Sequence, residues 1–349
     1  MRPTLKTCSR RSSLKKNLMT TPDLEAQLKA LETVIERSES FFMAGHLNPD
    51  GDTIGSMLAL ASVLKRLDKK VYLFSQDPVP ANLAFLPHIK NVKIARLPKK
   101  KFDAAILLEC SSPGRGGDIM GVLKRCGTVV NIDHHRTAEF YGDVNIVEPT
   151  ASATAEIVYR LFYNMGVHIT RREAICLYTG IVTDTGRFYF PATSPRTLEA
   201  ASRLLETGFN FSRINDLLYA TRSCISLKIL GRALESMEIT GAGKLAVMAL
   251  RNSDFTAFGA SPQHAESVIN HGMMVPGVKA AVLFREDPDK INATFRSRGH
   301  IDVSAVAKAF GGGGHMHAAG CRLQEPFAAV RSKVLRLLLK RLKAENDRG

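Results

Sequence analysis

The sequence predicts an α/β protein with a doubly wound, mostly parallel sheet, followed by a second, smaller α/β domain. In its first 210 residues, short apolar runs alternate with segments of helical periodicity, the pattern typical of a doubly wound sheet. Phe102–Leu108 is an almost unbroken apolar run, as expected for a parallel strand that is buried on both faces. The length of 349 residues has room for two domains of roughly 150 residues each.

Apolar spacing and flanking residues place the elements of the first domain. Thr53–Leu67, for example, has apolar residues at helical spacing and ends in the polar turn Asp68-Lys69-Lys70. The expected helices are Glu25–Ser38, Thr53–Leu67, Gly116–Arg125, Ser152–Met165, Arg171–Val182 and Pro195–Glu206. The expected strands are Phe41–Gly45, Val71–Ser75, Phe102–Leu108 and Thr128–Ile132.

The pattern changes after residue 209 and then starts a second unit. We expect a catalytic domain over 23–209, a helical linker over 210–230 and a substrate-binding domain over 231–349. The second domain should contain the strands Lys244–Leu250, Val278–Phe284, Ile291–Arg296 and Ala318–Leu323. Helices are expected at Pro262–His271, at Val303–Phe310 and at the C-terminus, with a Gly-rich turn at Gly311–Gly314.

Composition excludes several classes of protein. Hydrophobic residues make up 45% and charged residues 23%, which is ordinary for a globular protein. No window approaches the run of about 18 apolar residues that a membrane span requires. The six cysteines form no C-x-x-C pair, which argues against a disulfide framework and against a thiolate zinc site. We therefore expect a cytoplasmic protein without a membrane partner.

The net charge of +15 indicates an anionic partner such as phosphate, a nucleotide or nucleic acid. Part of this charge lies in a basic extension at residues 1–22, which has six Lys and Arg and no acidic residue. The extension lacks the apolar stretch of a secretory signal. It resembles a transit peptide or a disordered nucleic-acid-binding arm, and an unstructured extension with Met19 opening the folded protein is the third interpretation.

Four polar clusters stand at or near the ends of expected elements. They are His46 to Asp52, Glu109 with the residues after it, Asp133-His134-His135, and Thr179 to Gly186 with Asp184. Each has an ordinary interpretation by itself; Asp52, for example, could cap the helix that starts near Thr53. Together, imidazoles and carboxylates beyond the carboxyl ends of parallel strands indicate a divalent metal site.

These motifs resemble, in order and spacing, those of the DHH phosphoesterase family. The resemblance continues at Arg296 and at the Gly-Gly-Gly-His run, and it covers about 280 residues. It implies that His46, Asp50 and Glu109 hold one metal ion. Asp52, Glu109, His134 and Asp184 would hold a second, with Glu109, which stands where the family usually has Asp, bridging the two.

The resemblance also implies roles around the metals. Asp133 would orient the ligands, and His135 would face the phosphate; Arg115 is either a phosphate contact or a solvated residue at a helix start. In the second domain, a guanidinium and a glycine-rich backbone suit phosphate oxygens. The residues assigned to substrate binding there are Arg296, Gly312, Gly313, Gly314 and His315.

At this length the chain resembles the compact NrnA-like members of the family. They imply hydrolysis of very short RNA (nanoRNA and linear dinucleotides) to mononucleotides, and dephosphorylation of pAp. Mn²⁺ is the expected ion, with Mg²⁺ or Co²⁺ as alternatives. An inert nucleotide-binding protein, a RecJ-like exonuclease and an inorganic pyrophosphatase are the competing functions. A homodimer is expected only because twofold oligomers are common.

Overall fold

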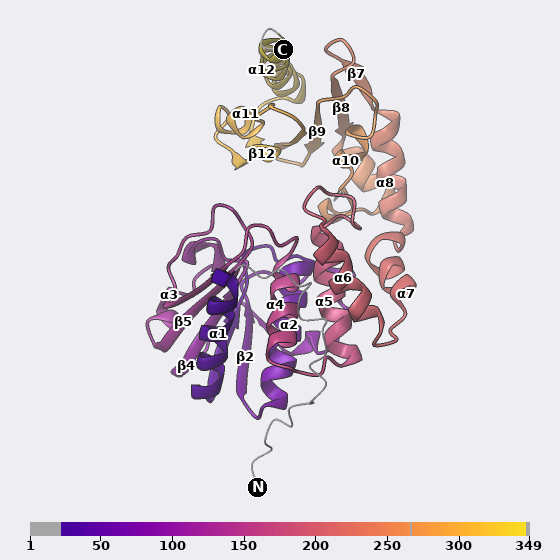
Figure 1. The fold of residues 1–349 in the computed structure, drawn as a ribbon. Coiled ribbons are helices and arrows are strands. Elements are labelled where there is room, and N and C mark those ends of the chain that lie inside the picture. The colour runs from indigo at the N-terminus through magenta and orange to yellow at the C-terminus, as the bar shows by residue number, and fades with distance from the viewer. Residues whose placement is uncertain (1–21, 266, 347–349) are drawn as a thin grey trace. The chain divides into compact units, whose positions relative to one another are not determined.

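The computed structural model describes residues 22–265 and 267–346, with residues 22, 23, 315 and 344–346 described by their backbone alone (Figure 1). The basic extension therefore lies outside the described residues, apart from Pro22 at the start of the first helix. The chain divides into two compact units, Met1–Thr221 and Arg222–Gly349, and each has hydrophobic cores of its own. The segment expected as a linker contains a short helix, α7 (Phe211–Asn215), and leads into the first helix of the second unit.

The first unit is built on a six-stranded sheet with the order β3-β2-β1-β4-β5-β6. All of its neighbouring strands run parallel, which confirms the predicted fold class. The strands are β1 (Ser40–Ala44), β2 (Lys70–Ser75), β3 (Val92–Ile94), β4 (Phe102–Leu108), β5 (Cys126–Asp133) and β6 (Val144–Val147). The helices are α1 (Pro22–Arg37), α2 (Gly51–Arg66), α3 (Met120–Leu123), α4 (Thr154–Asn164), α5 (Arg171–Asp184), α6 (Pro195–Leu205) and α7.

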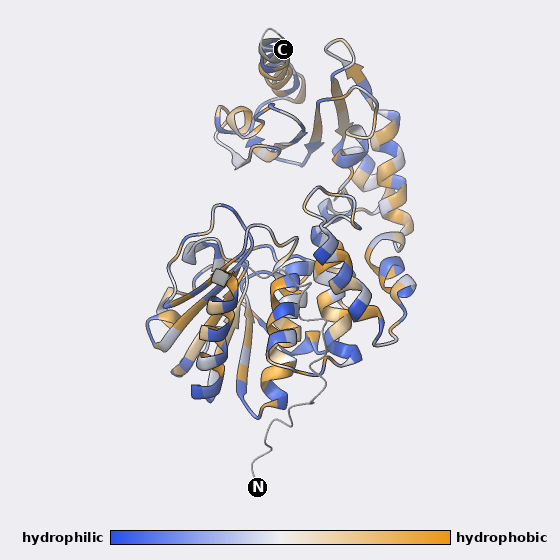
Figure 2. Ribbon diagram, in the orientation of Figure 1, coloured by the Kyte–Doolittle hydropathy of each residue, from blue (hydrophilic) through white to orange (hydrophobic). Residues whose placement is uncertain are grey.

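Both faces of this sheet are buried, and the residues of each strand alternate between them. Phe41 and Met43 pack into the larger core with α1, α2, α4 and α5. Phe42 and Ala44 pack on the opposite face, in a smaller core that includes Ile119 before α3. Burial on two sides explains why the strands are apolar along most of their length, as their orange colour in Figure 2 shows.

The second unit contains another six-stranded sheet, with the order β11-β12-β10-β9-β8-β7. Only β8 and β9 run parallel among its described pairs. The strands are β7 (Glu238–Thr240), β8 (Leu245–Leu250), β9 (Ala280–Glu286), β10 (Ile291–Ser297), β11 (Gly313–His315) and β12 (Ala318–Leu323). The helices are α8 (Cys224–Glu235), α9 (Asn252–Phe258), α10 (Ile269–Gly272), α11 (Ser304–Lys308) and α12 (Phe327–Asn346).

Two expected helices are interrupted. In place of Gly116–Arg125 the chain forms a 3₁₀ turn at Pro113–Gly116 and then the short α3, because Gly117 adopts a left-handed φ of +82° between them. In place of Pro262–His271 it forms a 3₁₀ turn and then α10, and Ser267 has a φ of +63°. The prediction of one continuous helix is wrong at both places.

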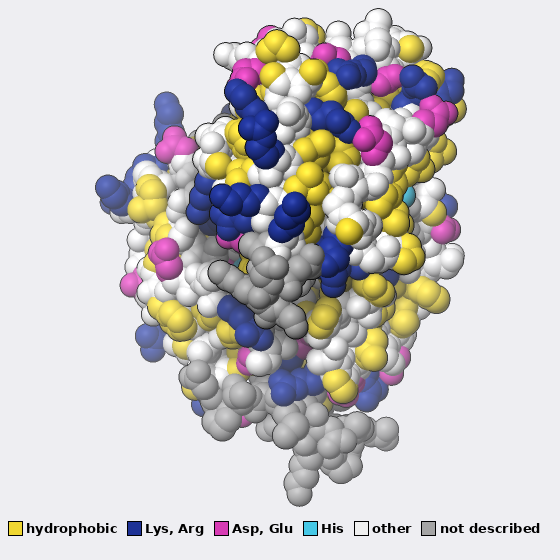
Figure 3. Space-filling view, turned by 90° about the horizontal axis from the view of Figure 1, so that it is seen from above, with side chains coloured by type: hydrophobic (Ala, Val, Ile, Leu, Met, Phe, Trp, Pro, Cys, Tyr) yellow, Lys and Arg dark blue, Asp and Glu magenta, His cyan; other side chains and the backbone are white. Residues whose placement is uncertain are grey.

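The surface reflects the basic composition. On the face shown in Figure 3, Lys and Arg side chains are spread more widely than Asp and Glu side chains. None of the helices in the described ranges combines the length and the apolar composition that a membrane span requires.

Candidate metal centre

The strand order creates a crevice where a site is expected. The chain leaves β1 towards β2 on one side and leaves β4 towards β5 on the other, so the loops that follow β1 and β4 diverge. Ligands in doubly wound sheets bind at such a switch point, beyond the carboxyl ends of the strands. His46 lies just beyond β1, Glu109 directly follows β4, and His134 directly follows β5. The fold therefore brings together three of the four predicted clusters.

The first group consists of His46, Asp50 and Glu109, whose ligand atoms lie within 4.8 Å of one another. Nε2 of His46 is 3.6 Å from Oδ2 of Asp50 and 3.7 Å from Oε2 of Glu109. Nδ1 of His46 lies 2.7 Å from the carbonyl oxygen of Leu47. A proton on Nδ1 satisfies that carbonyl and leaves the Nε2 lone pair for a metal ion.

The second group consists of Asp52, His134 and Asp184, within the same 4.8 Å limit. Nε2 of His134 lies 3.3 Å from both a Glu109 carboxylate oxygen and an Asp184 carboxylate oxygen. This nitrogen is buried and has no hydrogen-bond partner among the described residues, while Nδ1 lies 3.3 Å from the carbonyl oxygen of Ala151. An imidazole nitrogen that is buried among carboxylates without a hydrogen bond fits a metal ligand.

Asp52 is fully buried and holds the N-terminus of α4. Its carboxylate accepts hydrogen bonds from the backbone N–H groups of Thr154 (2.6 Å) and Ala155 (2.8 Å). The alternative that Asp52 caps the helix near Thr53 is therefore wrong. Asp50 caps α2 instead, because its Oδ1 accepts the N–H groups of Asp52 and Thr53. Both aspartates thus combine a helix cap with a place in the cluster.

Glu109 belongs to the first group and also contacts His134 of the second. It is buried, and its backbone has a left-handed φ of +57°, an uncommon conformation for a residue with a side chain. Oε2 accepts a hydrogen bond from Oγ1 of Thr53 at 2.5 Å, a contact that the sequence analysis missed. The only signal for Thr53 was its place directly after Asp52. The carboxylate of Glu109 reaches both histidines, so the longer side chain still occupies the position expected for a bridge.

The carboxylates of the cluster repel one another. Burial and the charges of Asp52, Asp50 and Asp184 raise the pKa of Glu109 well above its usual value. Burial and the charges of Asp52 and Asp50 raise the pKa of Asp184 to about 8. Burial also acts on Asp50, but the hydrogen bond to His46, the charge of His46 and the hydrogen bonds from Thr53 together outweigh burial and lower the pKa of Asp50. So many acidic groups in one place favour a bound cation, and these residues are positioned to bind metal ions.

Asp133 and His135 form a pair beside the cluster. Oδ1 of Asp133 lies 2.7 Å from Nδ1 of His135 and also accepts the His135 backbone N–H at 2.9 Å. Asp133 is fully buried, whereas His135 is 42% exposed, so the imidazole is held at one nitrogen and open at the other. The hydrogen bond to Asp133 raises the pKa of His135.

Arg115 lies in the 3₁₀ turn after β4, next to the loop that carries His46. Its carbonyl oxygen accepts the N–H of Leu47 at 2.6 Å, and its own Nε is buried without a described hydrogen-bond partner. Its guanidinium is close enough to oppose the protonation of both His46 and His135. Arg115 is half-buried in this turn, and its role as a phosphate contact stays a prediction.

The remaining predicted residues lie in the second unit. Arg296 on β10 and His315 on β11 both pair in register with Ala318 of β12, which places them two strand spacings apart, about 10 Å. The guanidinium of Arg296 donates a hydrogen bond to the carbonyl oxygen of Phe295, and burial lowers its pKa. The structure therefore brings Arg296 and the glycine-rich segment to one end of the same sheet.

The expected Gly-rich turn is in part a strand. Gly313 and Gly314 belong to β11, and β11 pairs antiparallel with β12. A Cβ on Gly312 would lie 2.2 Å from the carbonyl oxygen of Gly320, and one on Gly314 would lie 2.5 Å from that of Ala318. Close approach to β12 thus requires two of the glycines, whereas a Cβ on Gly313 would meet no heavy atom within 4 Å.

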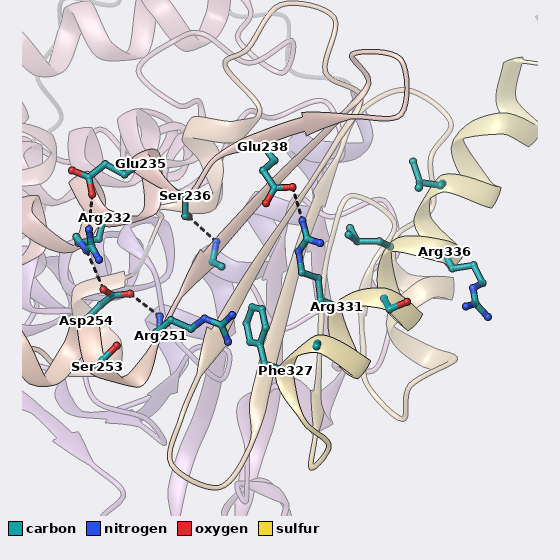
Figure 4. Close-up of a pocket in the computed structure, with 15 residues that line it drawn as sticks. Arg232, Glu235, Ser236, Glu238, Arg251, Ser253, Asp254, Phe327, Arg331 and Arg336 are labelled. Atoms are coloured by element: carbon teal, nitrogen blue, oxygen red, sulfur yellow. Dashed lines mark hydrogen bonds and ion pairs between the residues drawn. The ribbon is translucent and has the colours of Figure 1, made fainter.

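A cavity of about 1000 Å³ in the second unit contains none of these residues. It lies at α8, β8 and α12, and its labelled side chains are largely paired with one another (Figure 4). Arg232 binds Asp254 and Glu235, and Arg331 binds Glu238. The guanidinium of Arg251 stacks 3.3 Å above the centre of the Phe327 ring. This cavity is separate from the predicted substrate contacts.

Two family models match the chain, one in each of its two units. Residues 40–181 match the DHH family, N-terminal domain, and residues 243–345 match the DHHA1 domain. The bifunctional oligoribonuclease and PAP phosphatase NrnA of Thermus thermophilus is 32% identical over 299 residues, which cover 85% of this chain and 86% of that protein. The protein of the same name from Bacillus subtilis is 26% identical and covers 82% of this chain, with 90% of its own length matched.

A solved structure is similar along most of the chain. The exopolyphosphatase-related protein of Bacteroides fragilis matches with a TM-score of 0.86 at 26% identity, and the match covers 92% of this chain and 97% of that one. Family matches in both units, together with a relative above 30% identity along most of both chains, settle the family. The chain belongs to the DHH family of phosphoesterases, with a DHH domain followed by a DHHA1 domain.

Proposed function

We propose that the protein is a metal-dependent hydrolase that cleaves very short RNA, including linear dinucleotides, to mononucleotides, and that also dephosphorylates pAp. The observation that carries the proposal is the convergence of two histidines and four carboxylates at the switch point of the parallel sheet. Similarity to two relatives named bifunctional oligoribonuclease and PAP phosphatase supports this substrate class.

Two divalent ions are part of the proposal. One would be held by His46, Asp50 and Glu109, and the other by Asp52, Glu109, His134 and Asp184. A mixed set of imidazoles and carboxylates favours Mn²⁺ or Co²⁺ over Mg²⁺, which prefers oxygen ligands. Bound there, the ions would supply Lewis acidity and an activated water for displacement at phosphorus.

The residues beside the cluster would act directly on the substrate. His135 can present a protonated imidazole to a phosphate oxygen, because Asp133 holds Nδ1 and raises the pKa of the ring. Arg115 would contribute a fixed positive charge beside it. Both cations would stabilise the negative charge that develops on the phosphoryl oxygens in the transition state more than the charge of the bound substrate.

The second unit would bind the rest of the substrate. Arg296 is half-buried at the end of β10, and a guanidinium in that position can grip a phosphate with two parallel hydrogen bonds. A nucleotide phosphate would bind against the backbone of Gly312, Gly313, Gly314 and His315. Gly313 has no side chain to keep the phosphate away from this backbone, and the space beside it is open.

Glu109 favours a second candidate, a nucleotide-binding protein without turnover. The residue stands where the family usually has Asp, and its backbone adopts an uncommon left-handed conformation. Its carboxylate nevertheless lies within 3.7 Å of both histidines, which supports the hydrolase.

The test is a hydrolysis assay with the full chain. Labelled RNA of two to five nucleotides, pAp, pyrophosphate and longer single-stranded DNA are incubated with Mn²⁺, Mg²⁺ or Co²⁺, and with a chelator. We expect mononucleotides from the short RNA with Mn²⁺ and none with the chelator. Nucleotide binding without any product would support the second candidate, and turnover of pyrophosphate alone would show that the substrate class is wrong.

Asp184→Asn is the matched inactive control. Asp184 lies at the end of α5 and accepts no hydrogen bond within the described ranges, so its replacement should leave the fold intact. Asp52→Ala is the poorer control, because Asp52 also caps α4. Circular dichroism of the variant checks that the fold is retained.

A further inference from the structure

The loop that follows α5 presents two neighbouring aromatic side chains to solvent. Tyr189 is 85% exposed and Phe190 is 49% exposed. Single exposed apolar residues are common on protein surfaces, but an adjacent pair in a well-defined loop indicates a contact surface. The loop begins directly after Asp184, whose carboxylate lies in the metal cluster.

The backbone of this loop is strained. Gly186, Arg187 and Phe188 have successive left-handed φ values of +55°, +63° and +63°. Two of the three residues carry side chains, for which this conformation is unfavourable. Such strain persists only where the surroundings fix it, and it gathers at functional sites.

Several contacts fix the loop. The buried Thr185 is central, because its Oγ1 accepts the N–H of Phe188 at 3.1 Å and its carbonyl oxygen accepts that of Phe190 at 2.9 Å. The N–H of Arg187 donates to the carbonyl oxygen of Val182 at 2.8 Å, and its guanidinium lies 4.9 Å from the centre of the Tyr219 ring. The loop is therefore a defined support for the two exposed rings.

The two rings also position each other. Tyr189 and Phe190 meet edge to face, with centroids 6.1 Å apart and planes at 65°. The Phe190 ring lies against Gly186, where a Cβ would come within 2.6 Å of Cε2 of Phe190. Phe190 thus rests on the loop backbone, and Tyr189 extends beyond it with its ring open to solvent.

We propose that Tyr189, positioned by Phe190, stacks on a nucleobase of the substrate next to the phosphate that is cleaved. The hydrogen bond from Phe190 to Thr185 limits the distance between the Cα atoms of Phe190 and Asp184 to about 11 Å, from standard backbone dimensions. Aromatic rings bind unstacked bases of any sequence, because every base has a π face. The stacking would make the enzyme prefer nucleotide esters over phosphate esters without a base.

This inference rests on the proposed function, and its first test separates the base from the phosphate. The substrates are pApA and two analogues of it. In one analogue the first adenine is replaced by hydrogen, and in the other the second adenine is replaced. For Tyr189→Ala we expect KM for pApA to rise about 5- to 150-fold with little change in kcat. The same substitution should leave KM unchanged for the analogue that lacks the stacked base.

Two variants serve as controls. Tyr189→Phe keeps the ring and should restore the KM of the wild type. Tyr163→Ala removes a tyrosine that is 41% exposed at the other end of α4 from the Asp52 contact, and it should have no effect. An equal change of KM for pApA and for both analogues, or an equal effect of Tyr163→Ala, would overturn the proposal.

A binding measurement keeps the inference separate from turnover. The chain has no Trp and seven Tyr, so its intrinsic fluorescence comes from tyrosine. An uncleavable phosphorothioate dinucleotide should quench this fluorescence in the wild type and quench it less in Tyr189→Phe. If the chain cleaves no substrate but shows this difference in quenching, the proposed function fails and the stacking stands. If the wild type and Tyr189→Phe are quenched equally, and Tyr189→Ala binds the dinucleotide as tightly as the wild type, the stacking is overturned.

Discussion

The carboxylate of Asp52 accepts the backbone N–H of Thr154 at 2.6 Å, across 102 positions of the sequence. One side chain therefore joins the first turn of α2 to the first turn of α4, and the same side chain belongs to the candidate metal cluster. A negative charge at a helix N-terminus is favourable, and here the helix also fixes the direction of the carboxylate.

Asp52→Ala should be less stable than Asp52→Asn. Both substitutions remove the charge, but the single amide oxygen of Asn can still accept one of the two N–H groups of Thr154 and Ala155, whereas Ala leaves both without an acceptor. We expect the difference to be about 0.5–2 kcal/mol, the usual cost of losing a cap. Urea unfolding of the two variants without metal measures it, and equal midpoints would show that the cap contributes nothing.

Without metal, the protein should lose stability as the pH rises from about 5 to 8. The pKa of Asp184 is raised to about 8 and that of Glu109 is also raised, so the folded chain keeps protons that the unfolded chain has released. Stability then falls with pH, because the folded state binds more protons. Thermal unfolding with a chelator should show Tm falling by several degrees, whereas Mn²⁺ should largely remove the fall. A flat profile with the chelator would contradict the repulsion.

Glu109→Gln should weaken Mn²⁺ binding by at least about tenfold while the fold is retained. Gln has the shape of the protonated side chain, so it removes the charge near His46 and His134 without leaving a cavity. Calorimetric titration measures the affinity and the number of ions bound. Glu39→Gln, an exposed acid next to the start of β1, is the matched control. Unchanged affinity would exclude Glu109 as a ligand.

Gly55→Ala should destabilise the first unit and disturb the metal cluster. A Cβ at Gly55 would lie 2.3 Å from the carbonyl oxygen of Cys176, so α2 would have to move away from α5. We expect a loss of about 1–3 kcal/mol and weaker Mn²⁺ binding, because the two helices carry Asp52 and Asp184. A Cβ at Gly231 in α8 would meet no heavy atom within 4 Å, so Gly231→Ala should stabilise the second unit by about 0.5–1 kcal/mol. Similar changes in Tm for both variants would contradict the close contact.

The central parallel strands could be predicted from the sequence because burial on both faces leaves a clear apolar signal. Phe102–Leu108 was placed with the bounds that β4 has in the structure. The edge strands β3 and β6 gave no such signal, because they are short and only one residue of each is fully buried. The interrupted helices depend on left-handed residues such as Ser267, which no apolar spacing reveals.

The residues of the metal cluster were predicted because imidazoles and carboxylates at strand ends are few and distinctive. Their use as caps was not, because a cap depends on which helix lies nearby in space. Thr53 shows the same limit, since its contact with Glu109 joins segments 56 positions apart. The ligand roles, the substrate contacts, the cytoplasmic location and the homodimer stay predictions.

The strand order has a consequence for how the protein is made. The cluster draws on residues from His46 to Asp184, and it forms only after β1 has paired with β4 and α5 has docked on α2. A ribosome releases these segments one after another, so a nascent chain that has not yet exposed α5 lacks Asp184. Metal capture is therefore a late event in biosynthesis, and it would mark those chains whose first unit has finished folding.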